Sequence, residues 1–323
     1  TNGVDDDGDG MVDCFDPDCN DTLRCKGPGG LVRSVPAGWD GRYDLLFVID
    51  DSDGMAEEQQ MLRSQLGALT DQLLREPLQP LDLHLGVTST DLGIAPHEWA
   101  YCEAGTGDGG RLLGRECLAP GSGGHLIDAA PVGCEVTRDP DIGVCLAHDC
   151  ADVHCADAGT VIAEDGWGCP RCRNYAGALE DAFSCMADLG VIGCGFVQPL
   201  EALRLALDDH PENAGFVRED AFLAVLLVTD VDDCSARDPR LFDASDLDLG
   251  PFTSFRCFEQ GVTCDVNDRD AVGARLGCHP REDAEALLHS PSRYVDFLAQ
   301  LHDLEMVSVS IIAGPTNGNA AVV

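Results

Sequence analysis

Basic residues are scarce in this sequence of 323 residues. Only 20 lysines and arginines stand against 58 aspartates and glutamates, so the formal net charge is −38 at pH 7. Nucleic acids and anionic membrane surfaces attract proteins through basic side chains, so this balance argues against both as partners. Hard divalent cations, calcium above all, suit such a charge because they bind several carboxylate oxygens. A soluble acidic surface with no bound ion is the alternative explanation.

Long apolar runs are also missing, and no stretch approaches the length of a membrane span. The sequence begins with polar residues and shows no signal peptide. We therefore interpret it as a processed or trimmed form of the protein. Cysteine, by contrast, is abundant, with 17 residues. Enzymes of reducing compartments rarely carry so many, so we expect disulfides and a secreted, extracellular or cell-surface protein. The odd number leaves one thiol over.

Signatures of common hydrolases are missing as well. The sequence has neither a G-x-S-x-G nucleophile elbow nor an H-E-x-x-H metalloprotease helix. The glycine-rich segment 105–110 lacks the lysine of a phosphate-binding loop. We therefore predict a non-catalytic protein, with a hydrolase site hidden in the cysteine-rich segments as a further alternative.

The first 25 residues contain the most specific motif. Alternating aspartates in VDDDGDGMVDCFDPDC follow the D-x-D-x-D-G-x-x-D-x-x-D spacing of calcium loops. Carboxylates at alternate positions can surround one ion, while Gly10 permits the sharp turn. The predicted calcium ligands are Asp5, Asp7, Asp9, the carbonyl of Met11, Asp13 and Asp16. Asp16 stands where such loops usually have glutamate, and a disordered acidic tail is the alternative.

No amphipathic helices flank this loop, so it resembles the short calcium repeats of thrombospondin type 3 and of related bacterial surface proteins. Cysteines stand in for the helices in those repeats, a role open here to Cys14, Cys19 and Cys25. A stretch rich in glycine and proline then predicts a linker. The predicted organisation is a calcium-binding loop segment at 1–25, a linker at 26–39 and one domain at 40–323.

Apolar runs of strand length alternate with helical patterns in the third part. The runs are apolar on both faces, as in parallel strands covered by helices. The predicted strands cover 43–49, 81–91, 221–230 and 305–314, and the predicted helices 56–76, 176–189, 197–209 and 291–303. This alternation predicts an α/β fold with a mostly parallel sheet and helices on both faces. Cysteine-rich segments at about 92–175 and 231–285 are interpreted as disulfide-stapled insertions at one end of the sheet.

Acidic residues follow the first and third predicted strands. Asp50 begins a D-x-S sequence within FVIDDS, and Asp230 lies within LLVTDVDDCS. Ligands of open α/β sheets bind where the carboxyl ends of the strands gather. With this order of strands and helices, most of residues 40–314 resembles the von Willebrand factor A domains of secreted bacterial proteins.

The resemblance implies an adhesion site that holds magnesium, manganese or calcium. Matching the family's D-x-S-x-S motif and final aspartate by position gives Asp50, Ser52 and Asp230 as ligands. Gly54 replaces the last serine, and no hydroxyl residue stands near 193–196, where the family has a threonine. The residues that could compensate are Asp51, Asp53, Asp232 and Asp233. The alternative role of Asp50 and Asp230 is to cap helix starts.

We therefore expect a secreted or cell-surface calcium-binding module that adheres to a protein or glycan ligand. The family's last helix, strand and helix are missing from the sequence. This favours, as the alternative, a structural subunit of an extracellular fibre or sheath, in which a neighbouring copy completes the sheet. Cysteines and histidines at 145–155 and the CPRC at 169–172 also have zinc-ligand spacing, although the composition favours disulfides.

Overall fold

The computed structural model describes residues 41–74, 82–102, 105, 107–139, 144–208, 210–268, 273–283, 285–313 and 321–322. The chain divides into two compact units, Thr1–Trp39 and Asp40–Val323, and the described residues belong to the second. The predicted linker at 26–39 and the predicted calcium loop lie outside the described residues. The loop residues concerned are Asp5, Asp7, Asp9, Met11, Asp13 and Asp16.

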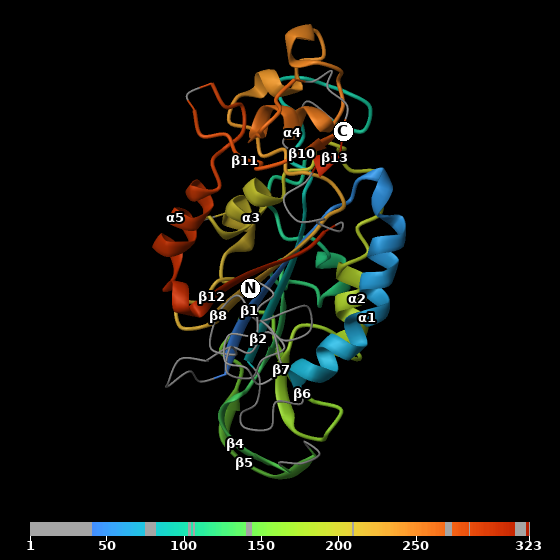
Figure 1. The fold of residues 1–323 in the computed structure, drawn as a ribbon. Helices are drawn as coiled ribbons and strands as arrows, with labels where there is room; N and C mark the ends of the chain where they lie inside the picture. Colours follow the sequence, from blue (N-terminus) through green and yellow to red (C-terminus); the bar gives the residue numbers. More distant parts are fainter. Residues whose placement is uncertain are drawn as a thin grey trace, which may run out of the picture. The chain divides into compact units, whose positions relative to one another are not determined.

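Four parallel strands form one side and the centre of a seven-stranded sheet (Figure 1). They are β1 (Arg42–Ile49), β2 (Asp82–Ser89), β8 (Phe222–Val228) and β12 (Val307–Ile312). β1 lies between β2 and β8, and β12 pairs with β8 at the edge of the sheet. The four predicted strands are confirmed, and the apolar runs of β1, β2 and β8 are buried because helices cover both faces.

Three antiparallel strands extend the sheet beyond β2, in the order β3, β7, β6. They are β3 (Leu126–Ala129), β6 (Val161–Glu164) and β7 (Pro170–Arg173). All three belong to the segment predicted as an insertion at about 92–175, so this segment also builds the sheet, a role that the sequence did not indicate. Between them, β4 (Val132–Arg138) and β5 (Cys145–His154) form a separate two-stranded sheet.

Helices pack on both faces of the sheet, as predicted. α1 (Ala56–Leu74) and α2 (Leu179–Met186) cover one face, and α3 (Pro199–Leu207) and α5 (Ser292–Leu301) cover the other (Figure 1). Successive residues of β1 serve the two cores. Phe47 contacts Phe183 of α2 at 4.6 Å between ring centroids, whereas Leu46 packs in the core that contains Leu203 of α3.

The segment 231–285 adds only short elements. Besides two 3-10 helices, Pro239–Phe242 and Leu247–Leu249, they are α4 (Phe255–Gly261), β9 (Val262–Thr263) paired with β11 (His279–Pro280), and β10 (Ala274–Arg275), which pairs with the later strand β13 (Ala321–Val322). The hydrophobic core beside α4 joins this segment to Ile94 and Phe196. The segment therefore packs against loops that precede it in the chain.

Seven disulfides crosslink the described chain, as the abundance of cysteine predicted. The pairs are Cys102–Cys194, Cys117–Cys185, Cys134–Cys150, Cys145–Cys169, Cys155–Cys172, Cys234–Cys257 and Cys264–Cys278. Because the cysteines at 145–155 and 169–172 are oxidised, they are not thiolate ligands, which removes the zinc alternative. Disulfides in this number fit an oxidising, extracellular type of environment. No helix in the described part combines the length and apolar character that crossing a membrane requires.

A buried ionic network lies at the amino ends of the parallel strands. Asp44 of β1 is fully buried and accepts hydrogen bonds from the backbone nitrogen and Nε of Arg218, at 2.6 and 2.8 Å. Arg218 also donates to Asp82 at 2.7 Å. Burial raises the pKa of Asp44 to about 6, although the Arg218 charge acts in the opposite direction. The network therefore depends on Arg218 to compensate a desolvated carboxylate.

Two buried histidines pack against each other beside this network. The rings of His84 and His125 lie 4.8 Å apart between centroids, and Nδ1 of His84 lies 3.0 Å from the carbonyl oxygen of Phe216. Burial lowers the pKa of His84 to about 4, and the Arg218 charge adds to this effect. Burial also lowers the pKa of His125 to about 3, helped by His84 and Arg218. Both rings are therefore uncharged at neutral pH.

This histidine pair should make the domain sensitive to acid. The ordinary histidine pKa is 6.5, so below it the unfolded chain binds protons that the folded chain excludes, and stability falls as the pH falls. Replacing His125 by glutamine should reduce the slope of unfolding free energy against pH, between pH 6.5 and 4, by about 1.4 kcal/mol per pH unit. Denaturant titrations at several pH values measure this slope.

The exposed His148 provides the matched control, because His148→Gln removes an imidazole that no described residue buries. The raised pKa of Asp44 favours the folded state at low pH, but it is common to all three proteins and cancels in the comparison. Equal slopes in the two variants would show that His125 does not carry the effect.

Candidate metal centre

Three strand ends meet at one edge of the sheet. The backbone nitrogen of Asp50, after β1, donates to the carbonyl of Val228 in β8 at 2.8 Å. The backbone nitrogen of Thr90, after β2, donates to the carbonyl of Ile49 at 3.2 Å. The residues that follow β1, β2 and β8 therefore lie side by side, where an open α/β sheet usually binds its ligands.

Asp50 connects two of these strand ends. It is fully buried, its Oδ1 accepts the backbone N–H of Ser52 at 2.9 Å, and its Oδ2 accepts the hydroxyl of Thr229 at 2.8 Å. Ser52 precedes the short 3-10 helix Asp53–Met55 that leads into α1, so Asp50 also satisfies an amide at a helix start. A carboxylate has about four acceptor positions, so these two bonds leave room for a further partner.

Asp230 lies against the turn that follows β1. Its Oδ2 is 2.6 Å from the place that a Cβ atom on Gly54 would occupy, so a side chain at position 54 would require the Asp230 carboxylate to move. Burial raises the pKa of Asp230, and the nearby charges of Asp50 and Glu58 raise it further. The structure thus brings Asp230 close to Asp50 and to the turn that contains Ser52 and Gly54.

Asp51 points toward the loop that contains Gly193. Its carboxylate atoms lie 2.3–2.5 Å from the place of a Cβ on Gly193, and the backbone nitrogen of Gly193 donates to the Asp51 carbonyl at 2.8 Å. Among the described residues, no hydrogen-bond partner faces Asp51 Oδ1, although the residue is only 8% exposed. Burial, with Asp91, Asp108 and Asp50 nearby, raises the Asp51 pKa to about 7. The carboxyl group of Asp51 therefore lies beside the segment 193–196, where the expected hydroxyl residue is missing.

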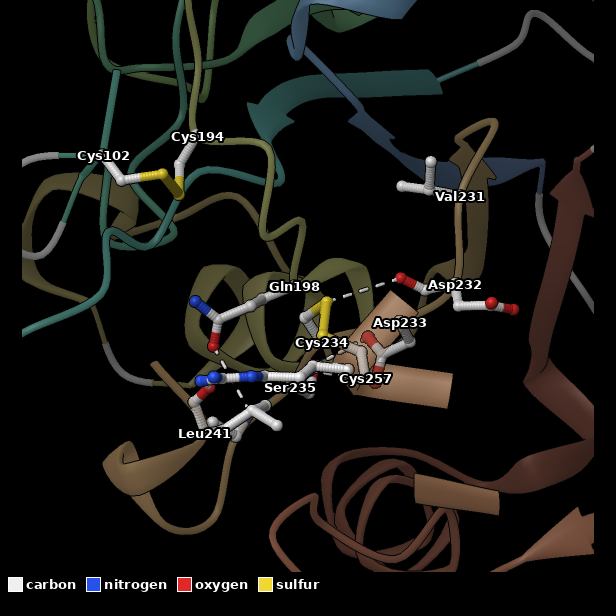
Figure 2. Close-up of a disulfide and its surroundings, with 12 residues drawn as sticks. Cys102, Cys194, Gln198, Val231, Asp232, Asp233, Cys234, Ser235, Leu241 and Cys257 are labelled. Carbon is white, nitrogen blue, oxygen red and sulfur yellow. Dashed lines mark hydrogen bonds between the residues drawn. A yellow bond between two sulfur atoms is a disulfide. The ribbon is translucent and has the colours of Figure 1, made fainter. Parts of the chain in front are cut away.

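The sequence left open that Asp233 replaces one of the missing metal ligands, but in the structure it caps a helix. Its Oδ1 accepts the backbone N–H of Leu200 at 3.2 Å and the hydroxyl of Ser235 at 2.7 Å, so it caps the start of α3. Figure 2 shows Asp233 on the same turn as Asp232. Asp232 and Asp53 are exposed. Among the described residues, neither the Asp53 nor the Asp232 side chain forms a hydrogen bond that would hold it near Asp50.

Two disulfides and one glutamine hold the loops around this edge. Figure 2 shows Cys102–Cys194 on one side of Gln198 and the pair Cys234–Cys257 on the other. The backbone nitrogen of Gln198 donates to the Thr90 carbonyl at 3.1 Å, and its Nε2 donates to the Gly93 carbonyl at 2.9 Å. The loop after β2 is therefore fixed to the start of α3.

A buried arginine organises the segment that follows β8. Arg256 is 1% exposed, and its guanidinium carbon lies 5.1 Å from the ring centroid of Phe252. Phe252 in turn contacts Trp99 and Phe196 at 4.8 and 4.9 Å between centroids. The guanidinium donates to the backbone carbonyls of Leu241, Asp243, Asp246 and Gly250 at 2.7–3.1 Å. One side chain thus fixes a loop that has little regular structure.

The carboxylates of Asp50 and Asp230 and the hydroxyl of Ser52 are oxygen donors of the type that hard cations bind. Magnesium is commonly held by one or two carboxylates, with water in the other positions. In the described ranges, no three aspartate, glutamate, histidine or cysteine side chains are placed to hold one ion between them. A cation at this edge would have to take its remaining ligands from water or from a partner molecule.

Comparison of the sequence with protein-family models and with curated proteins finds no match. The strand pattern pointed to Asp50 and Asp230, and the resemblance to von Willebrand factor A domains added Ser52. Neither gave a sign that Thr229 binds Asp50 or that Asp51 packs on Gly193.

Proposed function

We propose that the chain is a secreted or cell-surface binding module of the von Willebrand factor A type, without catalytic activity. The observation that carries the proposal is the meeting of Asp50, Ser52 and Asp230 at the carboxyl edge of the sheet. The open α/β sheet with helices on both faces fits such a domain, and the seven disulfides fit an extracellular location.

In this proposal Asp50, Ser52 and Asp230 hold a hard cation, magnesium, manganese or calcium. The cation, when bound, supplies a positive centre that attracts an anionic group of a protein or glycan ligand. Asp50 would keep the turn after β1 and the end of β8 together, through Ser52 and Thr229, whether or not an ion is present. The N-terminal aspartates, from Asp5 to Asp16, would hold a second, calcium ion.

Cation binding is tested by thermal unfolding and isothermal titration calorimetry of the whole chain. An ion that binds only the folded state stabilises it by about 2.7 kcal/mol at a free concentration 100-fold above the dissociation constant. The melting temperature should therefore rise with added calcium or magnesium and fall with a chelator. Asp230→Ala should remove the edge site, and the double variant Asp5→Asn, Asp7→Asn should remove the loop site.

The control is Asp296→Ala, which removes an exposed carboxylate of α5 and should leave both sites intact. If the Asp230→Ala protein binds the same number of ions as the unchanged protein, the edge site is wrong. If a chelator changes no melting temperature, the cation proposal fails as a whole.

A second candidate function is a structural subunit of an extracellular fibre or sheath. It is favoured by β12, which ends the order of strands in the sheet and exposes Val309, Ile311 and Ile312 by 44%, 60% and 53%. Among the described strands β12 has a neighbour on one side only, and edge strands can accept strands of other chains. Sedimentation at increasing protein concentration separates the candidates, because a subunit should assemble and an isolated binding module should stay monomeric.

A further inference from the structure

The hairpin of β4 and β5 lies at the opposite end of the sheet from the candidate metal centre. β3 runs antiparallel to β2, so it ends beside the first residues of β2, and β4 continues from there (Figure 1). The hairpin forms a sheet of only two strands, and every residue of it is exposed or partly exposed. Neither of its faces is therefore covered by another described element.

Three disulfides hold this exposed hairpin. Cys134–Cys150 joins its two strands, while Cys145–Cys169 and Cys155–Cys172 tie both ends of β5 to the region of β7. The backbone nitrogen of Cys145 also donates to the Trp167 carbonyl at 3.0 Å. An isolated hairpin is marginally stable in water. The crosslinks therefore stabilise a hairpin that has no hydrophobic core of its own. β4 is held at its end by the ion pair of Arg138 with Asp165, and β5 is its only neighbour among the described strands, so its other edge is open to a further strand.

Apolar side chains of the hairpin face solvent. Leu146 is 60% exposed, Val132 is 44% exposed and Val153 is 36% exposed. Trp167, beside the start of β5, is 41% exposed. Apolar side chains that gather on one small exposed element mark an interaction surface more often than a random scatter does.

Two carboxylates of the hairpin lie directly opposite each other. Glu135 of β4 pairs in register with Asp149 of β5, and both are exposed. Neither forms an ion pair with another described residue. Like charges directly opposite each other across a strand pair destabilise it. A basic group placed between or beside them would remove this repulsion.

We propose that the open edge of β4 binds an extended segment of another protein, which adds a third strand to the hairpin. The bound segment alternates basic residues with apolar ones. Its lysines or arginines lie over Glu135 and Asp149, and its apolar side chains lie on the face of Leu146. Strand addition supplies main-chain hydrogen bonds, and the alternating side chains supply specificity. The disulfides reduce the ordering cost of binding because the hairpin is already rigid.

The probe is a short synthetic peptide of alternating lysine and valine, titrated into the whole chain by calorimetry. A chelator is present throughout, so the result does not depend on the cation of the proposed function. The peptide should bind, and Glu135→Lys with Asp149→Lys should weaken binding by about tenfold or more, which corresponds to about 1.4 kcal/mol. The same peptide with alternate backbone nitrogens methylated keeps its charge but cannot form the ladder, so it should also bind at least about tenfold more weakly.

The matched control is Glu98→Lys with Asp296→Lys, which changes the net charge equally at exposed positions outside the hairpin. It should keep the affinity of the unchanged protein. The neutral variant Glu135→Gln repeats the test with less risk to folding, and far-ultraviolet circular dichroism checks each protein. The proposal is overturned if the hairpin variant and the control variant weaken binding equally. It is also overturned if the methylated peptide binds as tightly as the unmethylated one, or if the unmethylated peptide does not bind.

Discussion

Replacing Arg218 by methionine should lower the unfolding free energy of the domain by about 3–5 kcal/mol, because it leaves a buried carboxylate without its partner. Asp44 is fully buried, and Arg218 supplies both its charge partner and, through Nε, one of its hydrogen bonds. The same guanidinium donates to the Tyr43 carbonyl at 2.9 Å. Methionine restores part of the packing volume but none of these contacts. Denaturant unfolding at neutral pH measures the loss.

Two comparisons make this result specific. Arg42→Met removes a half-exposed arginine of the same region, which pairs with the exposed Asp220 and lies 3.9 Å from Asp82, and it should cost less than about 1 kcal/mol. The deficit of Arg218→Met should also shrink at pH 5, because the Asp44 pKa of about 6 rises further once Arg218 is gone and the carboxyl group becomes protonated. A deficit that is the same at pH 5 and pH 8 would contradict the assignment to Asp44.

Replacing Arg256 by methionine should have the second largest effect, again about 3–5 kcal/mol, because a buried polar group left without a partner costs about 1–3 kcal/mol. The guanidinium joins the backbone carbonyls of Leu241, Asp243, Asp246 and Gly250. These carbonyls would lose their donor, and Phe252 would lose the cation on its ring. The loop 239–250 should then become the first site of proteolysis, which limited digestion followed by mass spectrometry detects.

Arg240→Met is the control for this loop, since Arg240 is largely exposed and pairs only with Asp238 among the described residues. It should leave both the denaturation midpoint and the first cleavage site unchanged. If the two variants are cleaved alike, the loop does not depend on Arg256.

Burial on both faces explains why the sequence predicted the central strands. The run of β1 is apolar at every position from Leu45 to Ile49 because α2 covers one face and α3 the other. The meeting of Asp50 and Asp230 could also be predicted, since parallel strands end at the same edge. The central strands and the closeness of Asp50 to Asp230 could be predicted because both follow from the pattern of apolar runs and do not depend on how the loops fold.

The antiparallel strands could not be predicted in the same way. β6 and β7 are four residues long, and Pro170 and Arg171 in β7 give no apolar alternation. Their pairing is fixed by contacts distant in sequence, such as Arg171 with Asp128 at 2.6 Å and the disulfide between Cys155 and Cys172. The cap of α3 by Asp233 has the same origin, because its donor and acceptor are 33 residues apart.

Four of the seven disulfides lie within the span of a fifth. Cys102 and Cys194 are 92 residues apart in the sequence, and four further disulfides lie between them. Exposed loop tips are the usual places where proteases cut a folded chain. A single cut in any loop of this segment leaves both fragments covalently attached, so the protein can be nicked in a protease-rich medium without losing the residues on either side of the cut.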